Sequence, residues 1–252
     1  MQLFFNLDKK GVFKYNNNMV SKKKTVRLAI DNNALCSVLG LVKKIDEIQE
    51  KFEIDVQKIN INLLYPHGQS KKQLEKLDSL LRKLKQAYRG ELRFVITPTV
   101  LSEIFDTRIK FSKNGPNEFF HNFCVEHVAF TEKEQMLIDE LTKDLLTPIV
   151  KTKVHDGHEY QKTEFPFVGN HNKNHDHDAR IFSESIFAGT NLFTFDEDFK
   201  NKELIYETVQ NFEKKHPETN GISSFRIITP CSCRKQTPKK QNYNYQDISM
   251  DL

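Results

Sequence analysis

Residues 26–31 have the sequence VRLAID, and this short stretch decides the fold. It is a mostly apolar run that ends in an acid, which is typical of a strand buried inside a parallel sheet with helices on both faces. Residues 34–52 follow with helical period, and Asn32 and Asn33 are suitable helix caps. The stretch therefore predicts a central strand whose last residue, Asp31, places a carboxylate at the carboxyl edge of the sheet.

Three more segments have the character of strands: LRFVITP at 92–98, TNLFTF at 190–195 and SFRIITP at 224–230. Helical periodicity separates them, over residues 70–88, 100–111, 131–146, 178–189 and 203–215, with Ser70 and Thr99 as candidate caps. Strands that alternate with helices are typical of α/β proteins. We therefore predict a three-layer α/β/α sandwich with a mainly parallel sheet.

The pattern predicts one domain between two tails. The domain covers residues 26–230 and contains an insertion at about 107–175, of which residues 150–177 have no period and are predicted to form a long loop. Residues 1–25 form a basic N-terminal tail and residues 231–252 a polar C-terminal tail.

The composition excludes several classes of protein. Of the 252 residues, 38 % are hydrophobic and 29 % are charged, which is too apolar for a disordered chain and too polar for a membrane protein. Four cysteines do not make a disulfide framework in a chain of this length. We therefore expect a cytoplasmic protein without a membrane segment.

The net charge of +4 is unevenly distributed. Residues 1–27 carry seven Lys or Arg and one Asp, and residues 230–252 carry four basic and two acidic residues, so residues 28–229 have a net charge of −4. An acidic centre with basic ends is compatible with a metal-using nuclease. The charge distribution alone favours a solvated protein that has lysine-rich tails.

Acids recur where the predicted strands end. Asp31 ends the first strand, Glu103 lies on the helix after the second, and Asp196 and Asp198 follow the third, while Asp178 opens the helix before it. The carboxyl ends of parallel strands meet at one edge of a sheet, which is where such folds bind ligands. Crowded carboxylates repel unless a cation intervenes, and clusters of oxygen ligands suit Mg²⁺ or Mn²⁺. Each acid taken singly is also compatible with a helix cap or a solvated residue.

Four blocks in the same order resemble the PIN-domain nucleases. They are AIDNNAL (29–35), TPTVLSEIF (97–105), DARIFSESIFAG (178–189) and NLFTFDEDF (191–199). Asn32 stands where the family usually has a hydroxyl residue, and residues 107–175 make this chain longer than the toxin-type members.

The resemblance implies a metal-dependent endoribonuclease that cleaves single-stranded RNA. The acids that match the family's catalytic and metal-binding positions are Asp31, Glu103, Asp178 and Asp196, with Asp198 assisting at the metal. Asn33 and Thr194 match positions that orient carboxylates or metal-bound water. The implied cofactor is Mg²⁺ or Mn²⁺ and the implied partner is RNA. If the protein is a toxin or a defence effector, we also expect an antitoxin or another protein partner, and a homodimer. The alternatives are a catalytically inactive module that binds RNA or protein, and a nuclease that acts on DNA.

The histidine-rich segment 155–177 offers secondary candidates. Its HxxH and HxH spacings can bind transition metals, but no Cys pair lies nearby to complete a zinc site. Asp176, His175 and His177 directly precede Asp178 and are candidates to approach the metal site, the alternative for the histidines being simple solvent exposure. No Walker A, GxGxxG, GxSxG or HExxH motif occurs, which leaves P-loop hydrolysis and serine-type acyl transfer without support.

Overall fold

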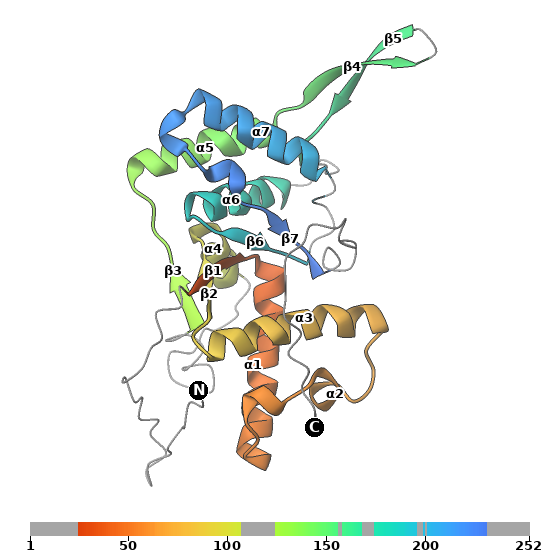
Figure 1. The fold of residues 1–252 in the computed structure, drawn as a ribbon, viewed down its shortest axis with the longest axis vertical. Helices are drawn as coiled ribbons and strands as arrows, with labels where there is room; N and C mark the ends of the chain where they lie inside the picture. The colour runs from red at the N-terminus through yellow and green to blue at the C-terminus, as the bar shows by residue number, and fades with distance from the viewer. Residues whose placement is uncertain are drawn as a thin grey trace, which may run out of the picture.

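The centre of the fold is a five-stranded, wholly parallel sheet. The structure is a computed structural model, and it describes residues 25–106, 124–155, 158–167, 174–195, 199 and 201–230. The strand order is β3-β2-β1-β6-β7 (Figure 1), and each neighbouring pair is parallel. The strands are β1 (Val26–Ile30), β2 (Leu92–Ile96), β3 (Val125–His127), β6 (Asn191–Phe193) and β7 (Ile227–Ile228).

Helices cover both faces of this sheet, as predicted. The main ones are α1 (Asn32–Phe52), α3 (Lys71–Tyr88), α4 (Pro98–Asp106), α5 (Glu132–Leu146), α6 (Asn174–Phe187) and α7 (Lys202–Lys215). Shorter turns are η1 (Val56–Lys58), α2 (Ile61–Leu64), η3 (Pro217–Thr219) and η4 (Ile222–Ser224). Figure 1 shows α1 and α3 on one side of the sheet and α6 on the other, with α5 and α7 packed outside α6. The predicted α/β/α class is confirmed.

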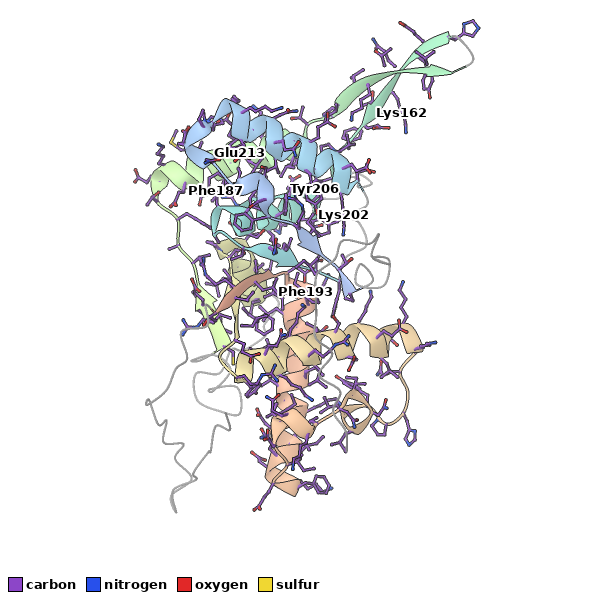
Figure 2. The ribbon with its side chains drawn as sticks, viewed as in Figure 1. Lys162, Phe187, Phe193, Lys202, Tyr206 and Glu213 are labelled. Atoms are coloured by element: carbon purple, nitrogen blue, oxygen red, sulfur yellow. The ribbon has the colours of Figure 1, made fainter. Side chains whose placement is uncertain are left out.

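The core forms where the central strands meet these helices. Ile30, Phe94 and Phe193 are fully buried at adjacent strands, and Figure 2 shows Phe193 within the sheet layer. Leu35 and Val42 of α1 are completely buried against the same layer. Burying one such side chain contributes about 1.5–3 kcal/mol to the free energy of unfolding. The buried core therefore holds the strands, and the residues at their ends, in fixed positions.

Helix capping follows the sequence closely in α3 and α5. Ser70 and Thr131 each form a capping box, with Gln73 and Glu134 respectively. For α1 the predicted caps Asn32 and Asn33 are wrong: both residues lie inside the helix, and Asp31 caps it. The strand therefore passes into the helix without an intervening loop, because the Asp31 carboxylate at the end of β1 accepts a hydrogen bond from the Ala34 N–H in the first turn of α1.

The start of α4 also differs from the prediction. The helix begins at Pro98, so Thr99 is its second residue and not its cap. Proline suits the first helical position because its missing N–H is not needed there. The Thr99 side chain is thereby free to bond with another helix.

The predicted loop at 150–177 is wrong over much of its length. It contains a hairpin of β4 (Ile149–His155) and β5 (His158–Glu164), and α6 begins inside it at Asn174. Strand β3 likewise lies in the insertion, where the sequence pattern predicted no strand. The hairpin projects from the body of the molecule (Figure 1), and β5 is exposed on both faces. Its sequence therefore does not need apolar and polar residues to alternate, which is the pattern that a half-buried strand would show.

Several predictions fall outside the residues that the structure describes. These are the tails at 1–24 and 231–252 and the part of the insertion at 107–123. Across the described ranges, none of the helices combines the length and the apolar character that a membrane span needs.

Asp46 is an unfavourably placed acid in the middle of α1. Its Oδ2 atom is buried and accepts no hydrogen bond from any described residue. Burial, followed by the charges of Glu50 and Glu47, raises the pKa of Asp46 to about 7. The folded protein thus holds this proton more tightly than the unfolded chain, whose Asp pKa is about 3.9.

Stability is therefore expected to fall as pH rises from about 4 to about 7, and to level off above that. Asp46→Asn removes the charged form and with it this slope. It is expected to raise the free energy of unfolding at pH 8 by about 1 kcal/mol, after allowance for solvent screening. Urea unfolding at pH 5 and pH 8 measures both effects. Glu159→Gln, which changes an exposed acid on β5, is the control, and an equal gain from both variants would contradict the assignment to Asp46.

Candidate functional site at the carboxyl edge of the sheet

Asp31 lies at the carboxyl end of the central strand and is fixed from two sides. Its backbone N–H donates to the Phe193 carbonyl at 3.2 Å, so the pairing of β1 with β6 extends to this residue. Its Oδ1 accepts from the Ala34 N–H at 2.7 Å, and its Oδ2 accepts from the Thr194 hydroxyl. The side chain is only 7 % exposed. One carboxylate therefore joins the end of β1, the start of α1 and the end of β6.

Two threonines stand at the same level as Asp31 on the neighbouring strands. The register pairs Ala29 with Val95 and Ile30 with Phe193, which continues to Thr97 on one side of Asp31 and Thr194 on the other. Both threonines are fully buried. Thr97 Oγ1 has no hydrogen-bond partner among the described residues. Thr97 was not predicted, although a hydroxyl residue directly after the apolar run LRFVI was a usable signal.

Glu103 and His177 come together across two helices. Glu103 lies on α4, its side chain is 22 % exposed, and its Oε1 is 2.9 Å from His177 Nδ1. His177 lies on the first turn of α6 and is 57 % exposed. The predicted second acid and one of the secondary histidine candidates are thus direct neighbours, although 74 residues separate them in the chain.

Cys36 on α1 shows that Asp31 and Glu103 share one neighbourhood. The pKa of its thiol is raised by burial, then by the negative charge of Asp31, and to a smaller extent by that of Glu103. The thiol lies 3.5 Å from Asn32 Oδ1. The charges of both carboxylates therefore act on this half-buried thiol.

Asp178 lies within α6 and does not open it. The helix begins four residues earlier, at Asn174, so Asp178 is partly exposed in the second turn and Asp176 is exposed in the first. An acid in the first turn favours helix formation there because it faces the positive end of the helix dipole. The prediction that α6 starts at Asp178 is wrong.

The remaining predicted residues are not part of this group among the residues that the structure describes. Asn33 is exposed on the first turn of α1, and its backbone carbonyl accepts from the Ser37 hydroxyl at 3.0 Å. Asp196, Asp198 and the side chain of His175 lie outside the described residues. Within the residues that are described, no three His, Cys, Asp or Glu side chains gather closely enough to hold a metal ion.

Glu184 is a buried acid beneath this edge that the sequence reading missed. It lies on α6, is 1 % exposed, and accepts from the Thr99 N–H at 3.0 Å and from the Thr99 hydroxyl at 2.8 Å. Arg180, one turn earlier, approaches it at 3.4 Å. Glu184 therefore fixes the start of α4, which carries Glu103, against α6, which carries His177. The usable signal was an acid inside the apolar run IFSESIF, four residues after an arginine.

A lysine completes the charge pattern near the edge. Lys76 of α3 donates to the carbonyl of Phe195 at 3.5 Å, and its ammonium lies 5.7 Å from the centre of the Phe195 ring. Phe195 directly follows Thr194. A cation therefore stands beside the strand end that delivers the hydroxyl to Asp31.

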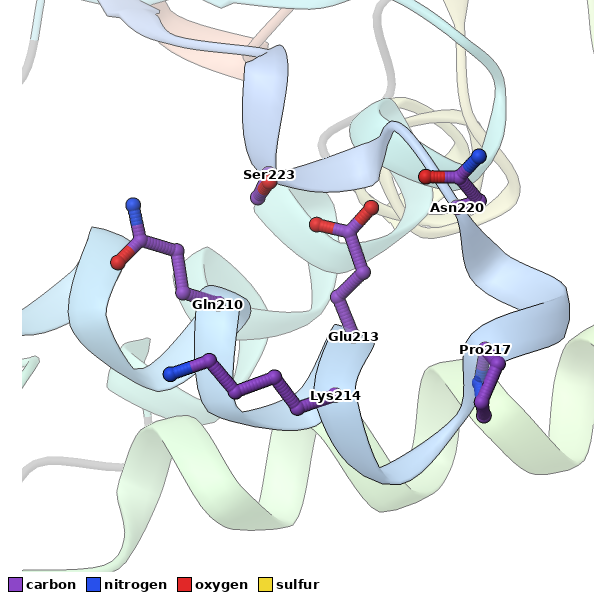
Figure 3. A pocket seen from close by; sticks show the side chains of 6 residues that line it. All are labelled: Gln210, Glu213, Lys214, Pro217, Asn220 and Ser223. Carbon is purple, nitrogen blue, oxygen red and sulfur yellow. The ribbon is translucent and has the colours of Figure 1, made fainter.

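A separate hollow lies at the opposite edge of the sheet. Figure 3 shows its lining, which comes from α7 and the turns after it: Gln210, Glu213, Lys214, Pro217, Asn220 and Ser223. Because η4 leads directly into β7, this hollow is at the amino edge. Glu213 accepts hydrogen bonds from Ser223 and the Gly221 N–H, which lower its pKa, so its charge serves to close the turn.

A comparison of the chain with models of protein families finds no match, and a comparison with curated protein sequences finds none either.

Proposed function

We propose that this protein is a divalent-metal-dependent endoribonuclease of the PIN-like type, which hydrolyses phosphodiester bonds in single-stranded RNA. The observation that carries the proposal is the placement of Asp31. A buried carboxylate at the carboxyl end of the central strand of a parallel sheet occupies the position where such folds bind ligands.

The donor atoms near Asp31 have the right chemistry for a hard cation. Glu103 shares its neighbourhood, Asp178 lies on the adjoining helix, and all three offer carboxylate oxygens, which Mg²⁺ and Mn²⁺ prefer. The described acids do not by themselves form a three-ligand group, so the proposal requires Asp196 or Asp198 to complete the set. A bound ion would supply positive charge to the phosphate and to the attacking water.

The chain's own groups have distinct parts in this proposal. The Ala34 N–H and the Thr194 hydroxyl hold the two oxygens of Asp31 and so fix the direction of its remaining lone pairs. His177 Nδ1, which lies 2.9 Å from Glu103 Oε1, orients that carboxylate. Lys76 provides a positive charge for a neighbouring phosphate.

One observation favours a catalytically silent module as the second candidate. Both oxygens of Asp31 already accept hydrogen bonds from the protein, as a purely structural helix cap would. In that case the same edge would bind RNA or protein without cleaving it.

Incubation of the full-length protein with single-stranded RNA and single-stranded DNA of equal sequence, with Mn²⁺ and with EDTA, tests the proposal. RNA cleavage that requires Mn²⁺, with DNA left intact, is the expected result. Cleavage of both strands would identify a nuclease that acts on DNA as well. RNA binding without cleavage in Mn²⁺ would overturn the enzymatic proposal in favour of the silent module.

A further inference from the structure

The β4–β5 hairpin, called the arm below, is a projecting element with no core of its own. Its strands pair from Ile149 with Glu164 to His155 with His158, and β5 is exposed from His158 to Thr163. Figure 1 shows it extending beyond α5 and α7, and Figure 2 places Lys162 on it. A two-stranded hairpin is only marginally stable alone in water. A ligand that binds to its exposed surface would therefore stabilise it.

The two faces of the arm differ sharply in chemistry. The register places Lys151 opposite Lys162, and alternation along β5 puts Tyr160 and His158 on the same face as Lys162. Lys153 occupies the register position opposite Tyr160. The other face carries neutral and acidic residues: Val150, Thr152, Val154, Glu159, Gln161 and Thr163. All the lysines of the arm therefore belong to one alternate set of positions.

Two lysines directly opposite each other are an unfavourable pair within a hairpin, because like charges repel. Each lysine has a carboxylate beside it: Lys151 pairs with the exposed Glu207 at 2.7 Å, and Lys162 pairs with the partly buried Glu164 at 2.8 Å. Ion pairs near the surface contribute little, and a phosphate can take the place of the carboxylate. The arrangement has the electrostatic character of a surface for a polyanion.

The base of the arm is tied to the edge that carries the candidate site. Phe167 packs against Phe182 of α6 at 6.4 Å and against Phe199, which follows the end of β6, at 5.3 Å between ring centroids. The Asn201 side chain donates to the Phe165 carbonyl at 2.9 Å. His177 of α6 contacts Glu103, and Thr194, which follows β6, contacts Asp31. The segment after β5 therefore packs against α6, one of the elements that carry the candidate site.

We propose that the face of the arm formed by Lys151, Lys162, Tyr160 and His158 binds single-stranded RNA on its way to the site. The lysines contact phosphates, and the ring of Tyr160, which is 45 % exposed, stacks on an unpaired base. The identity of the nucleic acid rests on the proposed function, but binding to the arm does not require cleavage.

The test compares two charge changes on adjacent residues. Lys162→Gln and Gln161→Glu each lower the net charge by one, on opposite faces of β5. Binding of a fluorescein-labelled oligouridine RNA is measured by anisotropy at several salt concentrations, in full-length protein that carries Asp31→Asn so that no RNA is cut. Lys162→Gln is expected to weaken binding and to reduce the slope of log affinity against log salt by about 0.7, the value for one phosphate contact on a single strand. Gln161→Glu is expected to leave both unchanged.

A second pair isolates the ring. Tyr160→Leu is expected to weaken binding about tenfold, whereas Tyr160→Phe, which keeps a stacking surface, retains it. Equal losses from Lys162→Gln and Gln161→Glu, or no loss from any arm variant, would overturn the inference and leave the arm as a surface for a protein partner. Arm-dependent binding by a protein that cuts nothing would retain this inference while the nuclease proposal failed, and cleavage with arm-independent binding would do the reverse.

Discussion

Asp31→Asn is expected to lower Mn²⁺-dependent RNA cleavage by about 100-fold or more, with almost no change in stability. Asparagine caps helices about as well as aspartate, so its carbonyl oxygen still accepts from the Ala34 N–H. Its amide then faces the hydroxyl oxygen of Thr194, which can accept in place of donating. The substitution removes the negative charge, which is what a cation requires.

Two further variants separate charge from capping. Asp31→Ala removes the cap and the carboxylate that accepts from the Thr194 hydroxyl, so it is expected to cost about 2 kcal/mol of stability as well as activity. Asp55→Asn changes another capping aspartate, which accepts from the Gln57 N–H at 2.8 Å on η1, and is expected to alter neither property. Cleavage rates in Mn²⁺ and urea unfolding in EDTA measure both effects. Full activity in Asp31→Asn would remove Asp31 from the proposed mechanism.

Glu184→Ala is expected to be the most destabilising single change to a charged residue, by about 3 kcal/mol. It leaves the Thr99 N–H, the Thr99 hydroxyl and the Arg180 guanidinium without their buried acceptor and opens a cavity. The melting temperature should fall by about 8 °C for a domain of this size. Because the start of α4 is no longer fixed, Glu103 should shift and cleavage should fall further than the folded fraction does.

The conservative change and a surface pair serve as controls. Glu184→Gln keeps one acceptor oxygen for Thr99 and is expected to lose less stability than Glu184→Ala. Glu91→Ala breaks an exposed pair with Arg89 at 2.8 Å and is expected to stay within about 0.5 kcal/mol of the parent. Urea denaturation followed by circular dichroism provides the comparison. A loss from Glu184→Ala no larger than that from Glu91→Ala would show that the buried contacts carry little energy.

The sequence by itself determined the elements whose burial is periodic. The apolar run before Asp31, the leucine stripe of α3 and the capping pattern at Ser70 each depend on residues within a few positions of one another, so the local sequence contains their full cause. The alternation of these elements was enough to predict a parallel sheet with Asp31 at its carboxyl edge.

Only the tertiary structure decided which side chains meet at that edge. Glu184 bonds with Thr99 across 85 residues, and Glu103 lies beside His177 across 74, and neither spacing follows from a helical or strand period. The arm was not predicted from the sequence because it has no buried face. Alternation along its strands separates lysines from neutral and acidic residues, and not apolar residues from polar ones. Periodic hydrophobicity indicates which faces of helices and strands are buried. It does not indicate which side chains meet when helices pack together, and it does not reveal strands that have no buried face.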